Sequence, residues 1–102
     1  MNASLLFLLI LCIFIFYSTD YRTFKDENGK VIPHLTVEKQ EQDMVAEYIH
    51  EGDKVLELGA RYGTVSAVIL DNVKDERDCV VVEPDSKVTN ALKSNLEGCN
   101  YG

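Results

Sequence analysis

The chain of 102 residues is long enough for one small domain at most, and its 10 basic and 17 acidic side chains give it a formal net charge of −7. Such an acidic surface repels phosphate backbones, which disfavours nucleic-acid binding driven by counterion release. The apolar content of 46% excludes a disordered chain, and three cysteines are too few for a disulfide scaffold, so we expect reduced thiols.

Residues 1–19 contain no Asp, Glu, Lys, Arg or His, and residues 3–17 are dominated by Leu, Ile and Phe. A membrane-spanning helix needs about 20 apolar residues, with about 17 as the lower limit. A cleaved signal peptide would carry a positively charged start and small residues at its cleavage site, which residues 16–19 do not resemble. A buried core helix is a further alternative, but a segment that is apolar on all sides fits lipid better. We therefore expect an uncleaved transmembrane helix over residues 1–19.

Basic residues flank this segment only on its carboxy-terminal side, where Arg22, Lys25 and Lys30 lie. The positive-inside rule relates such an asymmetry to the orientation of a membrane protein. It predicts a single-pass membrane protein whose globular part is cytoplasmic.

Residues 20–36 are predicted to form a linker between this anchor and the rest of the chain. Within it, residues 26–29 (DENG) are a turn signal, and Pro33 interrupts any helix. Residues 30–32 are a candidate short strand or hairpin arm. His34 has no second histidine or cysteine at ligand spacing, so we expect a solvated loop histidine and no metal site.

Residues 37–102 alternate between helical and strand patterns. Helices are predicted over residues 37–50, 64–73 and 86–97, and strands over residues 54–58 and 79–83. The second strand is continuously apolar, as a central parallel strand should be. Alternating strands and helices imply a parallel sheet, so we expect a Rossmann-like α/β fold in which the two strands are parallel neighbours. The chain holds only the first β-α-β-α units of such a fold, preceded by the transmembrane helix.

Glycines and carboxylates cluster where the two predicted strands end. Ligands of parallel sheets bind beyond the carboxyl ends of the strands. Gly59 and Gly63 allow the backbone to turn sharply and to approach a ligand closely. Glu57 lies just before this turn, and Glu83 stands at the tip of the second strand, where a carboxylate can accept both hydroxyls of a ribose. This pattern indicates a nucleoside-binding site.

Two nucleoside cofactors are compatible with such a pattern. The dinucleotide fingerprint G-x-G-x-x-G fails twice, because Arg61 and Thr64 stand where it needs glycine. S-adenosylmethionine has no phosphate and carries an ammonium and a sulfonium, so a carboxylate such as Glu57 suits its site. We therefore expect S-adenosylmethionine rather than NAD.

Residues 55–66 (VLELGARYGTVS) and 80–98 (VVVEPDSKVTNALKSNLEG) resemble the first half of class I S-adenosylmethionine-dependent methyltransferases, in particular those of the FkbM type. Members of that group commonly methylate hydroxyls of sugars and natural products. The resemblance covers residues 37–102. It implies that the methionine end of the cofactor is lined by Glu57, Gly59, Ala60 and Gly63, that Glu83 binds the ribose hydroxyls, and that Pro84 borders the adenine.

One residue departs from the family pattern. Arg61 stands where most class I enzymes have glycine and FkbM-like ones often have asparagine. A left-handed backbone at arginine costs about 1–2 kcal/mol, so either the loop avoids that conformation or the affinity for the cofactor suffers. The purely structural alternative is that Gly59 and Gly63 serve strand–helix packing and that Glu83 is stabilised by a helix dipole. Tyr62 is expected to be a packing or rim residue.

The resemblance implies O-methyl transfer to a hydroxyl of a small molecule or glycan by the full-length parent. No catalytic base is identifiable, so no catalytic residue is assigned. A complete fold of the family has more strands than this chain offers, so residues 37–102 are expected to be the amino-terminal part of a methyltransferase domain. The alternative is a truncated, catalytically inactive, membrane-anchored remnant with a partial nucleotide-binding half.

Overall fold

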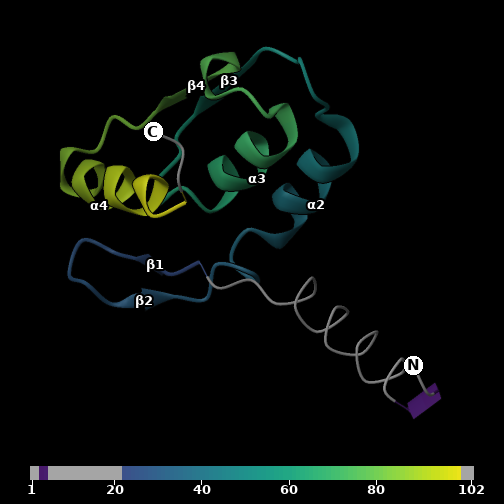
Figure 1. Ribbon diagram of the computed structural model, residues 1–102. Coiled ribbons are helices and arrows are strands. Elements are labelled where there is room, and N and C mark those ends of the chain that lie inside the picture. Colours follow the sequence, from purple (N-terminus) through teal and green to yellow (C-terminus); the bar gives the residue numbers. More distant parts are fainter. Residues whose placement is uncertain (1–2, 5–21, 100–102) are drawn as a thin grey trace.

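The computed structural model describes residues 3–4 and 22–99. The strands between residues 22 and 99 form two separate sheets of two strands each, β1–β2 antiparallel and β3–β4 parallel (Figure 1). In chain order the elements are β1 (Phe24–Lys25), β2 (Val31–Ile32), α2 (Lys39–Tyr48), β3 (Val55–Leu58), α3 (Thr64–Val73), a 3-10 helix (Glu76–Asp78), β4 (Cys79–Val82) and α4 (Ser86–Glu97).

The prediction of a Rossmann-like sheet behind a transmembrane helix is wrong. Residues 22–99 form a small α/β unit with two sheets of two strands each and three α-helices. In the part of the chain that the structure describes, no helix is long and apolar enough to cross a membrane. Most of the predicted anchor, residues 1–19, lies outside the described residues. Alternating strands and helices indicate the order of elements, but they do not determine how many strands pair into one sheet.

The β1–β2 hairpin is the antiparallel sheet, with Phe24 opposite Ile32. Its turn, residues 26–29, is held by Asp26 Oδ1, which accepts the backbone N–H groups of Asn28 at 2.8 Å and Lys30 at 2.9 Å. The turn and the hairpin arm predicted in the linker are therefore confirmed. Phe24 is completely buried, and β1 lies beside α4 (Figure 1). The hairpin is thus packed against the rest of the protein.

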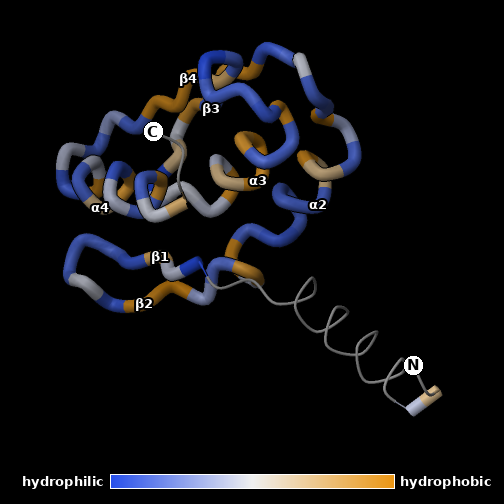
Figure 2. The backbone as a smooth tube through the Cα atoms, viewed as in Figure 1, coloured by the Kyte–Doolittle hydropathy of each residue, from blue (hydrophilic) through white to orange (hydrophobic). Residues whose placement is uncertain are grey.

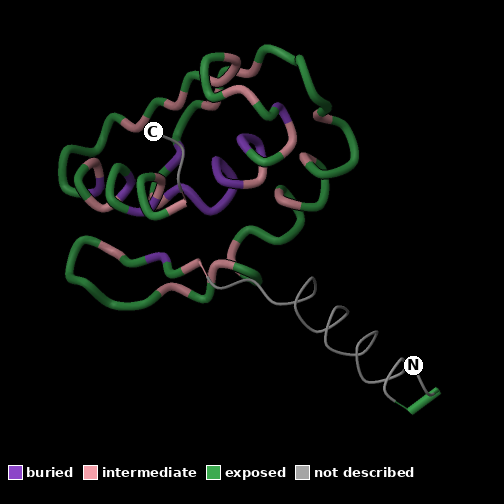
Figure 3. Tube along the Cα trace, viewed as in Figure 1, coloured by how far each residue is buried: buried purple, intermediate pink, exposed green. Residues whose placement is uncertain are grey.

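Strands β3 and β4 pair in parallel, from Val55 opposite Cys79 to Leu58 opposite Val82. This confirms the predicted neighbours and brings the carboxyl ends of both strands to the same edge. One face of the pair packs on α3, where Val55 and Cys79 contact a cluster built around Ile69. Figure 3 shows that buried residues concentrate on α3. The core of the described chain therefore lies between this sheet face and α2.

Helix α2 covers the other side of α3 through Val45 and Ile49, which pack on the same cluster. The Asn72 side-chain amide donates to the carbonyl oxygens of Val45 at 3.2 Å and Ile49 at 3.1 Å, and so ties the end of α2 to α3. Met44, Val45, Tyr48 and Ile49 recur at helical spacing, which predicts one inner face, but Met44 and Tyr48 are 61% and 66% exposed. Only one half of that apolar face is therefore in contact with the core.

The second face of the β3–β4 pair carries apolar side chains that no described element covers. Its residues are Leu56, Leu58, Val80 and Val82, and their exposed fractions run from 39% to 72%. Figure 2 shows the hydrophobic character of β4. The expectation that this strand is buried like a central parallel strand is wrong for the described chain, because α3 covers only one face.

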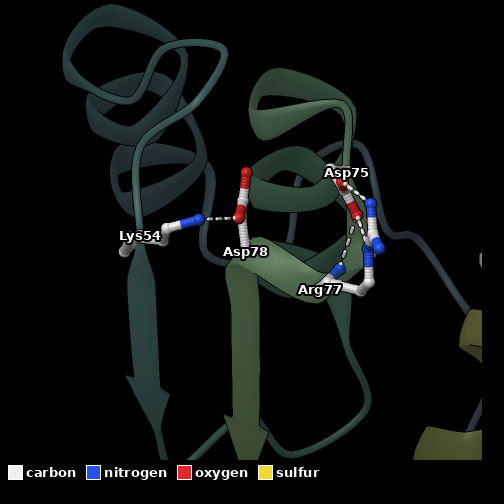
Figure 4. A network of polar contacts seen from close by, with 4 residues as sticks. All are labelled: Lys54, Asp75, Arg77 and Asp78. Atoms are coloured by element: carbon white, nitrogen blue, oxygen red, sulfur yellow. Dashed lines mark hydrogen bonds and ion pairs between the residues drawn. The ribbon is translucent and has the colours of Figure 1, made fainter.

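One ion pair joins the amino-terminal ends of the two strands, and a second lies within the segment that precedes β4 (Figure 4). Lys54, just before β3, pairs with Asp78, just before β4. Arg77 pairs with Asp75 at 2.8 Å, and hydrogen bonds from Arg77 lower the pKa of Asp75 to about 2. These contacts lie at the opposite end of the strands from the glycine turn, so they leave the carboxyl edge unobstructed.

Candidate functional site

The glycine loop, residues 59–63, leaves the carboxyl end of β3 and is tied to the end of β4. The N–H groups of Gly59 and Ala60 both donate to the Val82 carbonyl, at 2.8 and 3.1 Å. Three residues of the loop have positive φ angles: Gly59 at 78°, Arg61 at 50° and Gly63 at 90°. The loop therefore turns sharply, as predicted, and its start follows the edge of the parallel sheet.

The two glycines of the loop have different surroundings. A Cβ atom added at Gly63 would lie 3.1 Å from side-chain atoms of Leu92 and Leu96 on α4, so this glycine is needed for packing. A Cβ atom added at Gly59 would meet nothing within 4 Å. The structural interpretation therefore accounts for Gly63, whereas Gly59 borders open space that a ligand could enter.

Glu83 lies directly on the glycine loop. Its Oε1 accepts the Arg61 N–H at 2.8 Å, and its Oε2 accepts the Asp85 N–H at 2.7 Å. An ionised carboxylate offers about four acceptor positions, so one lone pair on each oxygen remains for further donors. Pro84 follows and is exposed. The structure thus brings Glu83 and the loop together, as the sequence predicted.

Glu57 has a different environment, half-buried and turned toward α3. The Ser66 hydroxyl donates to Glu57 Oε1. Burial raises the pKa of Glu57, the Ser66 hydrogen bond opposes this rise, and the nearby Glu38 carboxylate adds to it. Glu38 in turn accepts the Thr64 hydroxyl at 3.0 Å. The two predicted carboxylates thus have different partners: Glu57 is bound by a side chain of α3, and Glu83 by the backbone of the glycine loop.

Two residues that sequence reasoning did not assign to the site hold the glycine loop, one from α4 and one from the hairpin turn. Asn95, 5% exposed, donates from Nδ2 to the carbonyls of Tyr62 at 2.8 Å and Lys25 at 2.9 Å, and its Oδ1 accepts the Lys25 N–H at 2.9 Å. Glu27, in the hairpin turn, accepts the Tyr62 hydroxyl. An asparagine on the apolar face of a predicted helix was the available signal for the first contact. No local pattern indicates the second.

Arg61 adopts the left-handed conformation, with φ at 50°. The alternative in which the loop avoids that conformation is therefore wrong. Its guanidinium carbon lies 5.2 Å from the centroid of the Tyr62 ring, and Nη2 donates to the Tyr62 hydroxyl oxygen at 3.5 Å. Tyr62 is thus a rim residue, half-buried, that orients Arg61.

The remaining candidate groups contribute no ligand site. Cys79 and Cys99 are free thiols, as expected, and Cys12 lies outside the described residues. His34 is half-buried rather than solvated, because its ring stacks on Phe24 with the centroids 4.6 Å apart. Among residues 3–4 and 22–99, no group of three or more His, Cys, Asp or Glu side chains could hold a metal ion.

Comparison of the chain with protein-family models, with curated proteins and with solved structures finds no match. The functional interpretation therefore depends on the geometry and chemistry of the residues themselves.

Proposed function

We propose that the glycine loop and Glu83 bind S-adenosylmethionine, and that the protein contributes this site to an O-methyltransferase acting on a hydroxyl of a small molecule or glycan. The observation that carries the proposal is the contact between the Glu83 carboxylate and the Arg61 N–H. It joins an acceptor for ribose hydroxyls to a loop that lies beyond the carboxyl ends of two parallel strands.

The residues present fit the nucleoside part of this cofactor. Two backbone N–H groups, one on each oxygen, hold the Glu83 carboxylate, so its orientation is set before a ligand binds. The lone pairs that remain can accept the two hydroxyls of a ribose through charge-assisted hydrogen bonds. The open space beside Gly59 leaves room for the ligand, and exposed Pro84 can border its adenine.

The methionine end is assigned to Glu57 and to the backbone around Ala60. A half-buried carboxylate whose pKa is raised by burial gains from a cationic ligand, because a positive charge nearby favours the ionised form. Ala60 is 3% exposed, its N–H donates to the Val82 carbonyl and its carbonyl accepts the Gly63 N–H, so ligand contact in this part of the loop is left to the neighbouring exposed Gly59. When bound, S-adenosylmethionine supplies an electrophilic methyl group. The chain's own contribution is to bind and orient it.

A second candidate function is cofactor binding without methyl transfer by this chain. Leu58, which directly precedes the glycine loop, is 72% exposed. Methyl transfer needs the reacting groups to be held in a fixed geometry, and exclusion of water strengthens the electrostatic interactions involved. The openness of this edge favours a binding role for the described residues.

Calorimetric titration of the full chain with S-adenosylhomocysteine tests the proposal. Glu83→Gln keeps the shape of the side chain but removes its charge, and we expect a loss of affinity of about tenfold or more. Glu83→Ala should weaken binding more severely. Glu47→Gln, an exposed residue of α2, is the matched control and should leave affinity unchanged. Equal affinity of wild type and both Glu83 variants, at unchanged melting temperatures, would contradict the proposal.

The two candidate functions are separated by a transfer assay. Methyl-labelled S-adenosylmethionine is incubated with the chain and with sugars that carry free hydroxyls. Labelled product that disappears in Glu83→Ala supports the methyltransferase. Binding of S-adenosylhomocysteine without labelled product supports the binding role.

A further inference from the structure

Arg61 differs from the other two arginines of the chain in its partners. Arg22 pairs with Asp71 and Arg77 with Asp75, each at 2.8 Å. Among the described residues, the Arg61 guanidinium makes no ion pair with a carboxylate. In a chain with a formal net charge of −7, a cation without a carboxylate partner is an available binding group.

The backbone places this cation at the candidate cofactor site. Arg61 has φ at 50°, in the left-handed region that arginine rarely adopts, and its N–H donates to Glu83. Non-glycine residues in such conformations persist where surrounding contacts hold them, and they cluster at ligand-binding sites. Arg61 therefore stands next to Glu83, the proposed ribose contact.

The Tyr62 side chain orients the Arg61 guanidinium and leaves most of its N–H donors for a ligand. The Arg61 Cζ atom lies 5.2 Å from the centroid of the Tyr62 ring. The Tyr62 hydroxyl is fixed by the hydrogen bond that it donates to Glu27 of the hairpin turn. A guanidinium has five N–H donors, of which the 3.5 Å contact with the Tyr62 hydroxyl uses one. Within residues 22–99, no carboxylate therefore uses the fork that binds such groups with two parallel hydrogen bonds.

We propose that Arg61 binds the carboxylate at the amino-acid end of the ligand and so selects S-adenosylmethionine over nucleosides without that group; this rests on the function proposed above. The planar fork of arginine matches a carboxylate in geometry, and lysine or asparagine would not replace it. Tyr62 and Glu27 are positioning residues, because they act on the ligand only through Arg61.

The experiment compares two ligands that share the nucleoside but differ in the carboxylate. S-adenosylhomocysteine carries the amino-acid end, and 5′-methylthioadenosine lacks it. By calorimetry, we expect the wild-type chain to bind the first about tenfold more tightly. Arg61→Asn removes the guanidinium and tolerates the left-handed backbone. It should lose about tenfold in affinity for S-adenosylhomocysteine and should bind methylthioadenosine as wild type does. Arg77→Gln, another exposed arginine, should change neither affinity.

The positioning residues are tested with the same pair of ligands. Tyr62→Phe keeps the ring and removes the hydroxyl, and Glu27→Ala removes the acceptor of that hydroxyl. Each substitution should weaken the binding of S-adenosylhomocysteine by about threefold and leave the binding of methylthioadenosine unchanged. Glu27→Gln, which keeps an acceptor for the Tyr62 hydroxyl, should restore wild-type affinity. A merely structural role would weaken both ligands to the same extent.

The outcomes separate this inference from the proposed function. If both ligands bind wild type equally, or if Arg61→Asn weakens both equally, Arg61 does not read the carboxylate, and the cofactor site itself stands. If wild type binds neither ligand, the proposed function fails, and this inference fails with it. If adenosine monophosphate binds more tightly than methylthioadenosine in an Arg61-dependent way, the arginine serves a phosphate, and the proposal is overturned.

Discussion

The Asn95 side chain is the contact through which α4 holds both the hairpin and the glycine loop. Replacing it with alanine removes three hydrogen bonds, two to Lys25 and one to the Tyr62 carbonyl. Asn95 is 5% exposed, so little water reaches the groups that lose their partner. We therefore expect Asn95→Ala to destabilise the fold and to loosen the candidate site together.

The magnitude follows from the number of groups left unpaired. A buried polar group without a partner costs about 1–3 kcal/mol. Lys25 is exposed and its backbone groups are partly hydrated after the substitution, so the three groups do not count in full. We expect a loss of about 2–4 kcal/mol in the free energy of unfolding. For a domain of this size, such a loss lowers the melting temperature by about 10 °C or more.

Urea unfolding of the full chain, followed by circular dichroism, measures this loss as a shift of the midpoint at constant slope. Asn90→Ala is the matched control, because Asn90 lies on the same helix, is exposed, and has no side-chain hydrogen bond among the described residues. It also corrects for the higher helix propensity of alanine. A loss below about 0.5 kcal/mol for Asn95→Ala, or one equal to that of the control, would refute the reasoning.

Two further substitutions test the site. Gly63→Ala places a Cβ atom 3.1 Å from Leu92 and Leu96 at a φ of 90°, so we expect a loss of about 2 kcal/mol or more in urea unfolding. Gly59→Ala, with open space around it, should lose less, and the reverse order would contradict the assignment of Gly63 to packing. Burial raises the pKa of Glu57 above its ordinary value of 4.5, so at pH values above 4.5 the folded state binds more protons at this group than the unfolded state does. The stability that the protonated Glu57 contributes is therefore complete below pH 4.5 and is lost as the pH rises through the pKa of the folded state. Glu57→Gln should therefore be more stable than wild type at pH 7, with the advantage vanishing below pH 4.5; an advantage that does not vary with pH would contradict this.

The elements between residues 37 and 99 follow from local patterns. Helix α3 occupies Thr64–Val73, and β4 occupies Cys79–Val82, where apolar spacing and flanking glycine, proline and charged residues predicted them. These signals are local, because helical and strand periods and turn residues act within a few positions of the chain. The hairpin turn at Asp26 could be predicted for the same reason. The approach of Glu83 to the glycine loop, which spans 22 positions, was predicted instead from the rule that the carboxyl ends of neighbouring parallel strands lie at one edge of a sheet.

Only the tertiary structure decided which surfaces meet. In the part of the chain that the structure describes, it pairs β3 only with β4, leaves Leu58 exposed, and turns Glu57 toward Ser66. It also joins Asn95 to Lys25 across 70 positions of the chain. Contacts of this kind depend on the relative placement of elements that are distant in sequence, and no period or spacing within one element encodes that placement.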